Sequence, residues 1–149
     1  IKTPKLFFYD TALVCALLGI KTAADLELHP FKGGIFETFV VSEIFKFTYN
    51  HNQVPGLYFW RDTRGHEIDL LVERSYGDVV PVEVKAGMTM MPDQLRNLQE
   101  WRLLVSRPAQ LAYAVYGGDR YLEIKADRVY PWDQIAELLG AIYGTTDAA

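Results

Sequence analysis

The chain has 149 residues, of which half are hydrophobic and 23% are charged. These values suit a globular domain with a substantial core, and they exclude a disordered chain, which would be less hydrophobic. The formal net charge is −4, from 15 basic and 19 acidic residues. This charge disfavours a free-standing nucleic-acid-binding protein, which needs a cationic surface, although a basic groove can exist on an acidic protein.

The sequence also limits membrane insertion and disulfide bonding. The longest unbroken apolar run, residues 12–18, is too short to span a bilayer, and no cationic, apolar leader opens the chain. Cys15 is the single cysteine, so no intramolecular disulfide can form. We therefore expect a cytoplasmic protein with no membrane partner, and the abrupt start at Ile1 suggests a C-terminal fragment of a longer chain.

The first 50 residues are predicted to be mostly helical. Residues 5–9 form a strand-like apolar segment, and Asp10 is a good N-cap for a short helix after it. A connection over residues 21–34 contains a helical turn around residues 23–28. From residue 35 to about 49, apolar residues recur at helical spacing, which predicts a long, largely buried helix.

The hydrophobic pattern changes to period two after residue 50, which predicts strands separated by tight turns. The expected strands cover residues 57–61, 66–73 and 79–86. Because tight hairpins join them in succession, they should form an antiparallel meander.

Helix and strand alternate again in the last third of the chain. Pro92 suits the first turn of a helix that reaches Val105, and residues 110–116 form another apolar strand. Since a helical crossover joins this strand to the third, the two should be parallel. A segment over residues 121–125 and an amphipathic helix over residues 132–143 follow. The predicted fold is therefore α/β, with a mixed sheet flanked by helices.

Charged side chains occupy the centres of the second and third expected strands. On the second strand, strict alternation places Asp69 and its neighbours Glu67 and Leu71 on one face. The opposite face carries the apolar residues Ile68, Leu70 and Val72. On the third strand, Glu83 and Lys85 share a face opposite three valines. A solvated sheet face alone would explain this pattern.

The proximity of Asp69 and Glu83 in the meander favours a metal site over a solvated face. Two carboxylates ~4 Å apart repel by ~4 kcal/mol at an effective dielectric near 20. A fold tolerates this only with a neutralising cation, a shared proton or strong hydrogen bonds. Oxygen ligands predict Mg²⁺ or Mn²⁺ as the cation. Lys85 would offset part of the charge, orient a water and stabilise the charge that develops during phosphodiester cleavage.

The long helix offers a further carboxylate for this site. Glu37 and Glu43 both lie within its nearly continuous apolar sequence, so at least one of them must face inside the protein. Helical phase does not choose between them.

Five short motifs occur in order along the chain. They are Lys5-Leu-Phe-Phe-Tyr-Asp10, Gly34-Ile-Phe-Glu37 with Glu43, Tyr58-Phe-Trp-Arg61, Gly65-His-Glu-Ile-Asp69 and Glu83-Val-Lys-Ala-Gly87. In these motifs the chain resembles the PD-(D/E)XK, or restriction-endonuclease-like, nuclease superfamily. It is more closely similar to the uncharacterised domain at the C-terminus of many prokaryotic AAA-type ATPases, and the likeness extends to about Gly117. The resemblance implies a helix, a three-strand meander, a helix and a further strand as the core, over about residues 33–117 of a single domain that spans residues 1–149.

The resemblance also implies roles for individual residues. Asp69 and Glu83 would bind Mg²⁺ or Mn²⁺ with help from the Val84 carbonyl. Glu37 would complete the metal shell, and Lys85 would activate a water molecule for attack on the phosphodiester.

The chain departs from the superfamily pattern at two positions, and two further roles stay open. No proline precedes Asp69 in its strand, and Gln94 lacks the tyrosine that follows the corresponding glutamine in some relatives. Glu67 is as consistent with a carboxylate at the rim of the site as with a ligand. The helix motif favours Glu37 over Glu43.

Three functions are consistent with the sequence. The first is a Mg²⁺-dependent nuclease, attached to the ATPase region of a longer protein and acting on DNA or RNA; the intact acidic set favours it. The second is a catalytically silent nuclease-like module that binds nucleic acid or a protein partner for that ATPase, which the net charge of −4 favours. The third is a purely structural domain that dimerises or packs on the ATPase.

Overall fold

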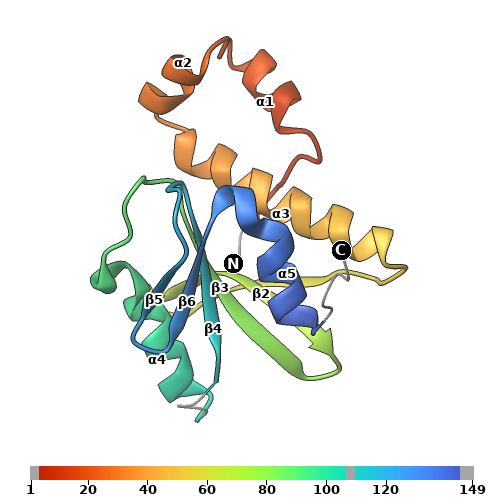
Figure 1. Cartoon of the computed structure of the whole chain (residues 1–149), viewed down its shortest axis with the longest axis vertical. Helices are drawn as coiled ribbons and strands as arrows, with labels where there is room; N and C mark the ends of the chain where they lie inside the picture. The colour runs from red at the N-terminus through yellow and green to blue at the C-terminus, as the bar shows by residue number, and fades with distance from the viewer. Residues whose placement is uncertain (1–3, 107–109, 145–149) are drawn as a thin grey trace.

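The computed structural model describes residues 4–106 and 110–144, which form a six-stranded mixed sheet between two layers of helices (Figure 1). The helices are α1 (Thr11–Leu17), α2 (Ala23–Leu28), α3 (Lys32–Asn50), α4 (Arg96–Leu104) and α5 (Ile135–Tyr143), with the short 3-10 helices η1 (Pro92–Leu95) and η2 (Trp132–Gln134). The strands are β1 (Gly56–Arg61), β2 (Glu67–Ser75), β3 (Asp78–Lys85), β4 (Ala112–Tyr116), β5 (Leu122–Ile124) and β6 (Asp127–Pro131). They lie in the order β1-β2-β3-β4-β6-β5.

The predicted succession of a helix, a meander, a helix and a parallel strand is confirmed. α3 precedes the meander, in which β1 pairs with β2 and β2 pairs with β3 in antiparallel fashion. α4 then crosses to β4, which is parallel to β3. None of the helices in the described ranges combines enough length with enough apolar character to cross a bilayer.

Three features of the fold differ from the sequence-based expectations. Residues 4–10 form neither helix nor strand, although their apolar sequence predicts a strand. α3 begins at Lys32 and continues through Gly33 and Gly34, which the sequence assigned to the connection before the helix. β6 was not expected as a strand; it lies between β4 and β5, parallel to β4.

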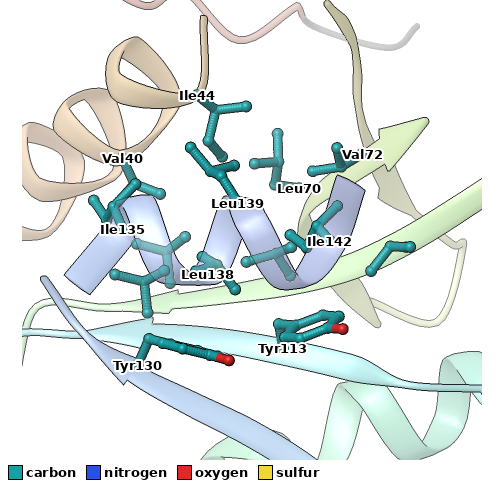
Figure 2. Packing of buried hydrophobic residues seen from close by; sticks show 14 of the residues in the cluster. Val40, Ile44, Leu70, Val72, Tyr113, Tyr130, Ile135, Leu138, Leu139 and Ile142 are labelled. Carbon is teal, nitrogen blue, oxygen red and sulfur yellow. The ribbon is translucent and has the colours of Figure 1, made fainter. Parts of the chain in front are cut away.

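Two apolar layers cover the two faces of the sheet. On one face, α3 and α5 pack against the strands, as Figure 2 shows for Val40, Ile44, Leu138, Leu139 and Ile142. On the other face, η1 and α4 contribute Leu95, Leu98 and Trp101. The core extends past residue 117: β6 supplies Val129 to the α4 layer and Tyr130 to the layer of α3 and α5, and α5 has four buried residues in the latter. Figure 1 shows α1 and α2 beyond α3, on the side away from the sheet.

An irregularity in β2 changes which residues face which layer. Tyr58 of β1 is opposite Leu71, whereas Trp60 is opposite Ile68, so two steps along β1 correspond to three along β2. β2 therefore carries an extra residue between Ile68 and Leu71, which is a β-bulge. Beyond the extra residue, each side chain faces the side of the sheet opposite to the one that strict alternation predicts.

The prediction that Ile68, Leu70 and Val72 share one face is therefore wrong. Ile68 packs in the α4 layer together with Leu71, while Leu70 and Val72 pack in the layer of α3 and α5. Asp69 lies within the bulged stretch, where the strand bends, and the next subsection describes the contacts of its side chain.

Candidate active site

β2 and β3 bring the predicted site residues together. Leu70 is paired with Val82, and Asp69 and Glu83 are the residues next to this pair on the two strands. The Oδ2 atom of Asp69 accepts a hydrogen bond of 2.9 Å from the backbone amide of Val84. This contact fixes the Asp69 carboxylate against β3.

Lys85 links the two carboxylates. Its Nζ atom donates a hydrogen bond to Glu83 Oε1 at 2.5 Å and to Asp69 Oδ2 at 3.3 Å. The predicted convergence of Asp69, Glu83 and Lys85 is thus confirmed as geometry. Their roles in metal binding and catalysis stay predictions, as does the role of the Val84 carbonyl.

Glu83 is the most deeply buried member of the group, with 2% of its surface exposed. Its Oε2 atom is buried and has no hydrogen-bond partner among the described residues. Burial and the negative charge of Asp69 raise the pKa of Glu83 from 4.5 to about 7, against the opposing effect of the Lys85 ammonium. An unpartnered buried carboxylate oxygen is costly, so this atom is suited to receive a proton or a cation.

Lys85 carries the positive charge of the site. Burial lowers its pKa, but the charges of Asp69 and Glu83 outweigh burial and raise the pKa above the usual 10.5. The ammonium is therefore protonated at neutral pH. Its side chain is 28% exposed, so solvent reaches the cluster from the side of Lys85.

Glu37 lies in a second ionic network. Its Oε1 atom is 2.9 Å from Lys5 Nζ, and the same ammonium is 2.8 Å from Glu67 Oε1. Glu67 Oε2 in turn accepts a hydrogen bond of 2.8 Å from Arg61 Nε. The structure therefore pairs Glu37 with a lysine that precedes α1, and the prediction that Glu37 completes a metal shell remains untested.

The rival carboxylate, Glu43, lies elsewhere on α3. It forms an ion pair of 2.6 Å with Lys46. Both residues line a pocket together with residues of η2 and α5, and no residue of β2 or β3 lines that pocket. This position favours Glu37 over Glu43 as a neighbour of the acidic site.

Two other candidates have local structural roles. Gln94 accepts a hydrogen bond of 2.7 Å from the Met91 amide at the start of η1, which makes it a capping residue. His66 Nδ1 lies 2.8 Å from Asp62 Oδ2, and Asp62 also accepts the backbone amide of His66. These contacts hold His66 at the turn that precedes β2.

Lys5 begins the first sequence motif, but the sequence did not predict it as a site residue. It lines a pocket of about 350 Å³ together with Asp69. The other lining residues are apolar or aromatic: Phe7, Val41, Phe45, Leu57, Tyr58, Phe59 and Leu70. Lys5 is the charged residue of an otherwise apolar segment, which was a signal, but Glu37 and Glu67 are too distant in sequence for any local pattern to identify them as its partners.

The donor set suits a divalent cation held by few protein ligands. Within residues 4–106 and 110–144, no three His, Cys, Asp or Glu side chains lie close enough together to hold one metal ion. Mg²⁺ commonly binds through one or two carboxylates and keeps several waters. Asp69 and the unpartnered Oε2 of Glu83 fit that mode, and a fully protein-built cage does not.

Comparison with known proteins identifies a family and two relatives. A family model described as a domain of unknown function, DUF4143, matches residues 32–135. The uncharacterized proteins Mb2031c of Mycobacterium bovis and Rv2008c of Mycobacterium tuberculosis are each 30% identical to the chain over 147 residues. Each alignment covers 95% of this chain and 32% of the relative, so the chain spans about a third of the relatives' length. No solved structure matches the chain significantly.

Proposed function

The chain belongs to the DUF4143 family, and we propose that it is a nuclease domain of the PD-(D/E)XK superfamily that hydrolyses phosphodiesters with Mg²⁺ or Mn²⁺. The observation that carries the proposal is the placement of Asp69 beside Glu83, whose Oε2 lacks a partner, with the Lys85 ammonium in contact with both. The succession of α3, the β1–β3 meander, α4 and β4 supports it, since this is the core that the superfamily resemblance implies.

Asp69 and Glu83 would hold the cation. When bound, a divalent cation supplies Lewis-acid stabilisation of phosphoryl oxygens and lowers the pKa of a water molecule. The hydrogen bond from the Val84 amide keeps Asp69 in place, so the Asp69 carboxylate needs little reorganisation to act as a ligand. Glu83 must give up its proton first, because only the carboxylate binds a cation.

Lys85 would act on the phosphate and the attacking water. Its ammonium already has two carboxylate partners, and a partly exposed lysine can turn one of its three protons towards a phosphoryl oxygen. A positive charge held beside developing negative charge stabilises the transition state more than the ground state. Lys85 therefore contributes to catalysis without being a metal ligand.

The whole protein would be larger than this chain. The relatives extend well beyond the region matched here. We take the remaining part to be the AAA-type ATPase that the motif resemblance implies, which would present DNA or RNA to the nuclease domain.

A catalytically silent module that binds nucleic acid or a protein partner for the ATPase is the second candidate. Two observations count against cleavage and so favour this module, in its protein-binding form: the net charge of −4, which opposes binding of a polyanion, and the ion pair that holds Glu37 on Lys5. Such a module would keep the fold and the acidic cluster but would not cleave.

The test is a calorimetric titration of Mn²⁺ into the wild type, Asp69→Asn and Asp119→Asn. Asp119 is the matched control, since its exposed carboxylate lies 3.8 Å from the neighbouring Arg120. We expect the Asp69 variant to lose at least about tenfold in Mn²⁺ affinity, because one of two charged ligands is gone, and the Asp119 variant to match the wild type. Equal Mn²⁺ binding by all three proteins contradicts the proposed site.

Cleavage of labelled single- and double-stranded DNA and RNA then separates the two candidates. The nuclease predicts Mg²⁺- or Mn²⁺-dependent products with the wild type and the Asp119 variant, and a strong loss with the Asp69 variant. Metal binding at Asp69 without cleavage of any substrate favours the silent module. The assay should include a longer protein that contains the attached region.

A further inference from the structure

Lys5 binds the carboxylates on the α3 side of the site as a metal cation would. Its Nζ atom lies between Glu37 Oε1 and Glu67 Oε1, at 2.9 and 2.8 Å. Burial lowers the pKa of Lys5, but hydrogen bonds and charge interactions with these two carboxylates raise it overall, so the group is cationic. The ammonium also lies 5.5 Å from the centre of the Phe59 ring, a favourable cation–π contact.

This ammonium borders the acidic site at one of its residues, Asp69. Lys5 and Asp69 line the same cavity of about 350 Å³. Glu67 and Asp69 lie on the same strand, and Glu37 faces them from α3 across Lys5. The unpartnered, buried Oε2 of Glu83 shows that the neighbouring cluster still has a free oxygen for a cation.

Three kinds of contact hold residues 4–10: the ion pairs of Lys5, the packing of Phe7 against the core, and the edge-on contact of the Tyr9 ring with Phe45. Residues 4–10 form no regular secondary structure, and α1, which follows them, has no buried residue. Lys5 and Phe7 are the part-buried side chains of this segment, whereas Leu6 and Tyr9 are largely exposed. The ion pairs of Lys5 therefore contribute the polar part of the contacts that hold this segment.

We propose that Lys5 is a built-in competitor of the divalent cation: it holds Glu37 away from Asp69 and Glu83 in the metal-free domain, and it must release Glu37 for a three-carboxylate site to form. The inference rests on the proposed function. The physical reason is that one carboxylate oxygen cannot bind an ammonium and a metal ion at full strength together, and like charges in one pocket repel. Metal binding would consequently loosen residues 4–10 and α1.

The first test is the Mn²⁺ affinity of Lys5→Met, measured by calorimetry beside the wild type. Removing the ammonium should tighten Mn²⁺ binding by about tenfold or more, because a neighbouring charge commonly changes ion affinity by that factor. Lys5→Arg keeps the charge and should bind Mn²⁺ like the wild type. The matched control is Lys46→Met, which removes the partner of Glu43 on the same helix and should change nothing.

The second test needs no variant and so does not depend on how Lys5→Met folds. Amide hydrogen exchange is followed by mass spectrometry in the wild type, with and without Mn²⁺. Mn²⁺ should speed exchange in residues 4–17 while it slows or leaves unchanged exchange in β2 and β3. Unchanged or slower exchange in residues 4–17 overturns the inference.

The outcomes distinguish this inference from the function on which it rests. If Mn²⁺ binds through Asp69 but Lys5→Met leaves the affinity unchanged or weakens it, Lys5 is a structural support and only the competitor role fails. If neither the wild type nor Lys5→Met shows Asp69-dependent binding, both proposals fail. Tighter binding in Lys5→Met that Lys5→Arg does not share supports the competitor role.

Discussion

Two groups of buried charged side chains, Arg102–Asp127 and Asp69–Glu83–Lys85, differ in whether their positive and negative charges are equal in number. Arg102 of α4 pairs with Asp127 of β6, and the two side chains are 8% and 1% exposed. Arg102 also donates a hydrogen bond of 2.8 Å to the Gln110 carbonyl. The Asp69–Glu83–Lys85 group instead sets two carboxylates against one ammonium, and that ammonium is partly open to solvent.

The difference separates a structural pair from a site that can take up a cation. One guanidinium and one carboxylate cancel, and the Arg102–Asp127 pair joins α4 to β6 in a position closed to solvent. In the second group, one negative charge is left over and is relieved by partial protonation of Glu83. A fold gains nothing in stability from such an excess, which is typical of a functional site.

The largest effect on the free energy of unfolding is expected when the Arg102–Asp127 pair is broken. Arg102→Met leaves the Asp127 carboxylate buried without its partner, so we expect the free energy of unfolding to fall by about 3–5 kcal/mol. Chemical denaturation measures it. Arg96→Met, on the exposed side of the same helix, should stay within about 0.5 kcal/mol of the wild type.

A double variant sharpens this prediction. Combining Arg102→Met with Asp127→Leu replaces both charges by apolar groups and should recover much of the lost stability. An Arg102→Met protein as stable as the wild type would show that the pair is not structural.

Replacing Lys85, the ammonium of the Asp69–Glu83–Lys85 group, should lower the rate of catalysis. Lys85→Ala should reduce phosphodiester cleavage by roughly 10²–10³, the usual effect of losing one electrostatic contact to the transition state. Mn²⁺ affinity should be kept or rise, because the lysine charge opposes cation binding. Weaker Mn²⁺ binding by the Lys85 variant would mean that Lys85 organises the ligands.

The third prediction concerns the pH dependence of stability. The pKa of Glu83 is about 7 in the folded protein and near 4.5 when unfolded, so between these values the folded state binds more protons. The contribution of Glu83 to the free energy of unfolding is therefore fully present below about pH 4.5. It is lost as the pH rises towards 7, which lowers the free energy of unfolding by up to about 3 kcal/mol.

Glu83→Gln should remove this loss, because the amide does not titrate. The difference in unfolding free energy between Glu83→Gln and the wild type should therefore grow from pH 4.5 to pH 8 in metal-free buffer. Glu100→Gln, at an exposed position of α4, is the control and should show no such trend. A difference that does not vary with pH would mean that Glu83 is ionised throughout.

The smallest effect is expected for Asp69→Asn in the metal-free protein. The amide oxygen can still accept the Val84 hydrogen bond, and repulsion with Glu83 is removed while an ion pair with Lys85 is lost. Unfolding free energy should stay within about 1 kcal/mol of the wild type or increase. Asp69→Ala also loses the Val84 bond and should be less stable by about 1–3 kcal/mol. A loss above about 2 kcal/mol for the Asn variant would assign Asp69 a structural role.

The sequence by itself determined the order of the elements and the pairing of the acidic strands. Periods of 3.6 and 2 residues predict α3, the meander, α4 and β4, because burial of one face imposes those periods locally. The short turn between β2 and β3 then puts Asp69 and Glu83 next to the Leu70–Val82 pair, and alternation within β3 places Lys85 beside Glu83. These relations depend on residues that are near in the sequence.

The tertiary structure decided the features that depend on distant residues. The bulge in β2 reverses which layer the residues beyond it face, so strict alternation misassigns Ile68. β6 is stabilised as a strand partly by the contact of Asp127 with Arg102 of α4. The ion pairs of Lys5 join residues that are 32 and 62 positions apart, by the difference of their numbers. Only folding creates such contacts, because they depend on how whole elements pack and leave no periodic trace in the chain.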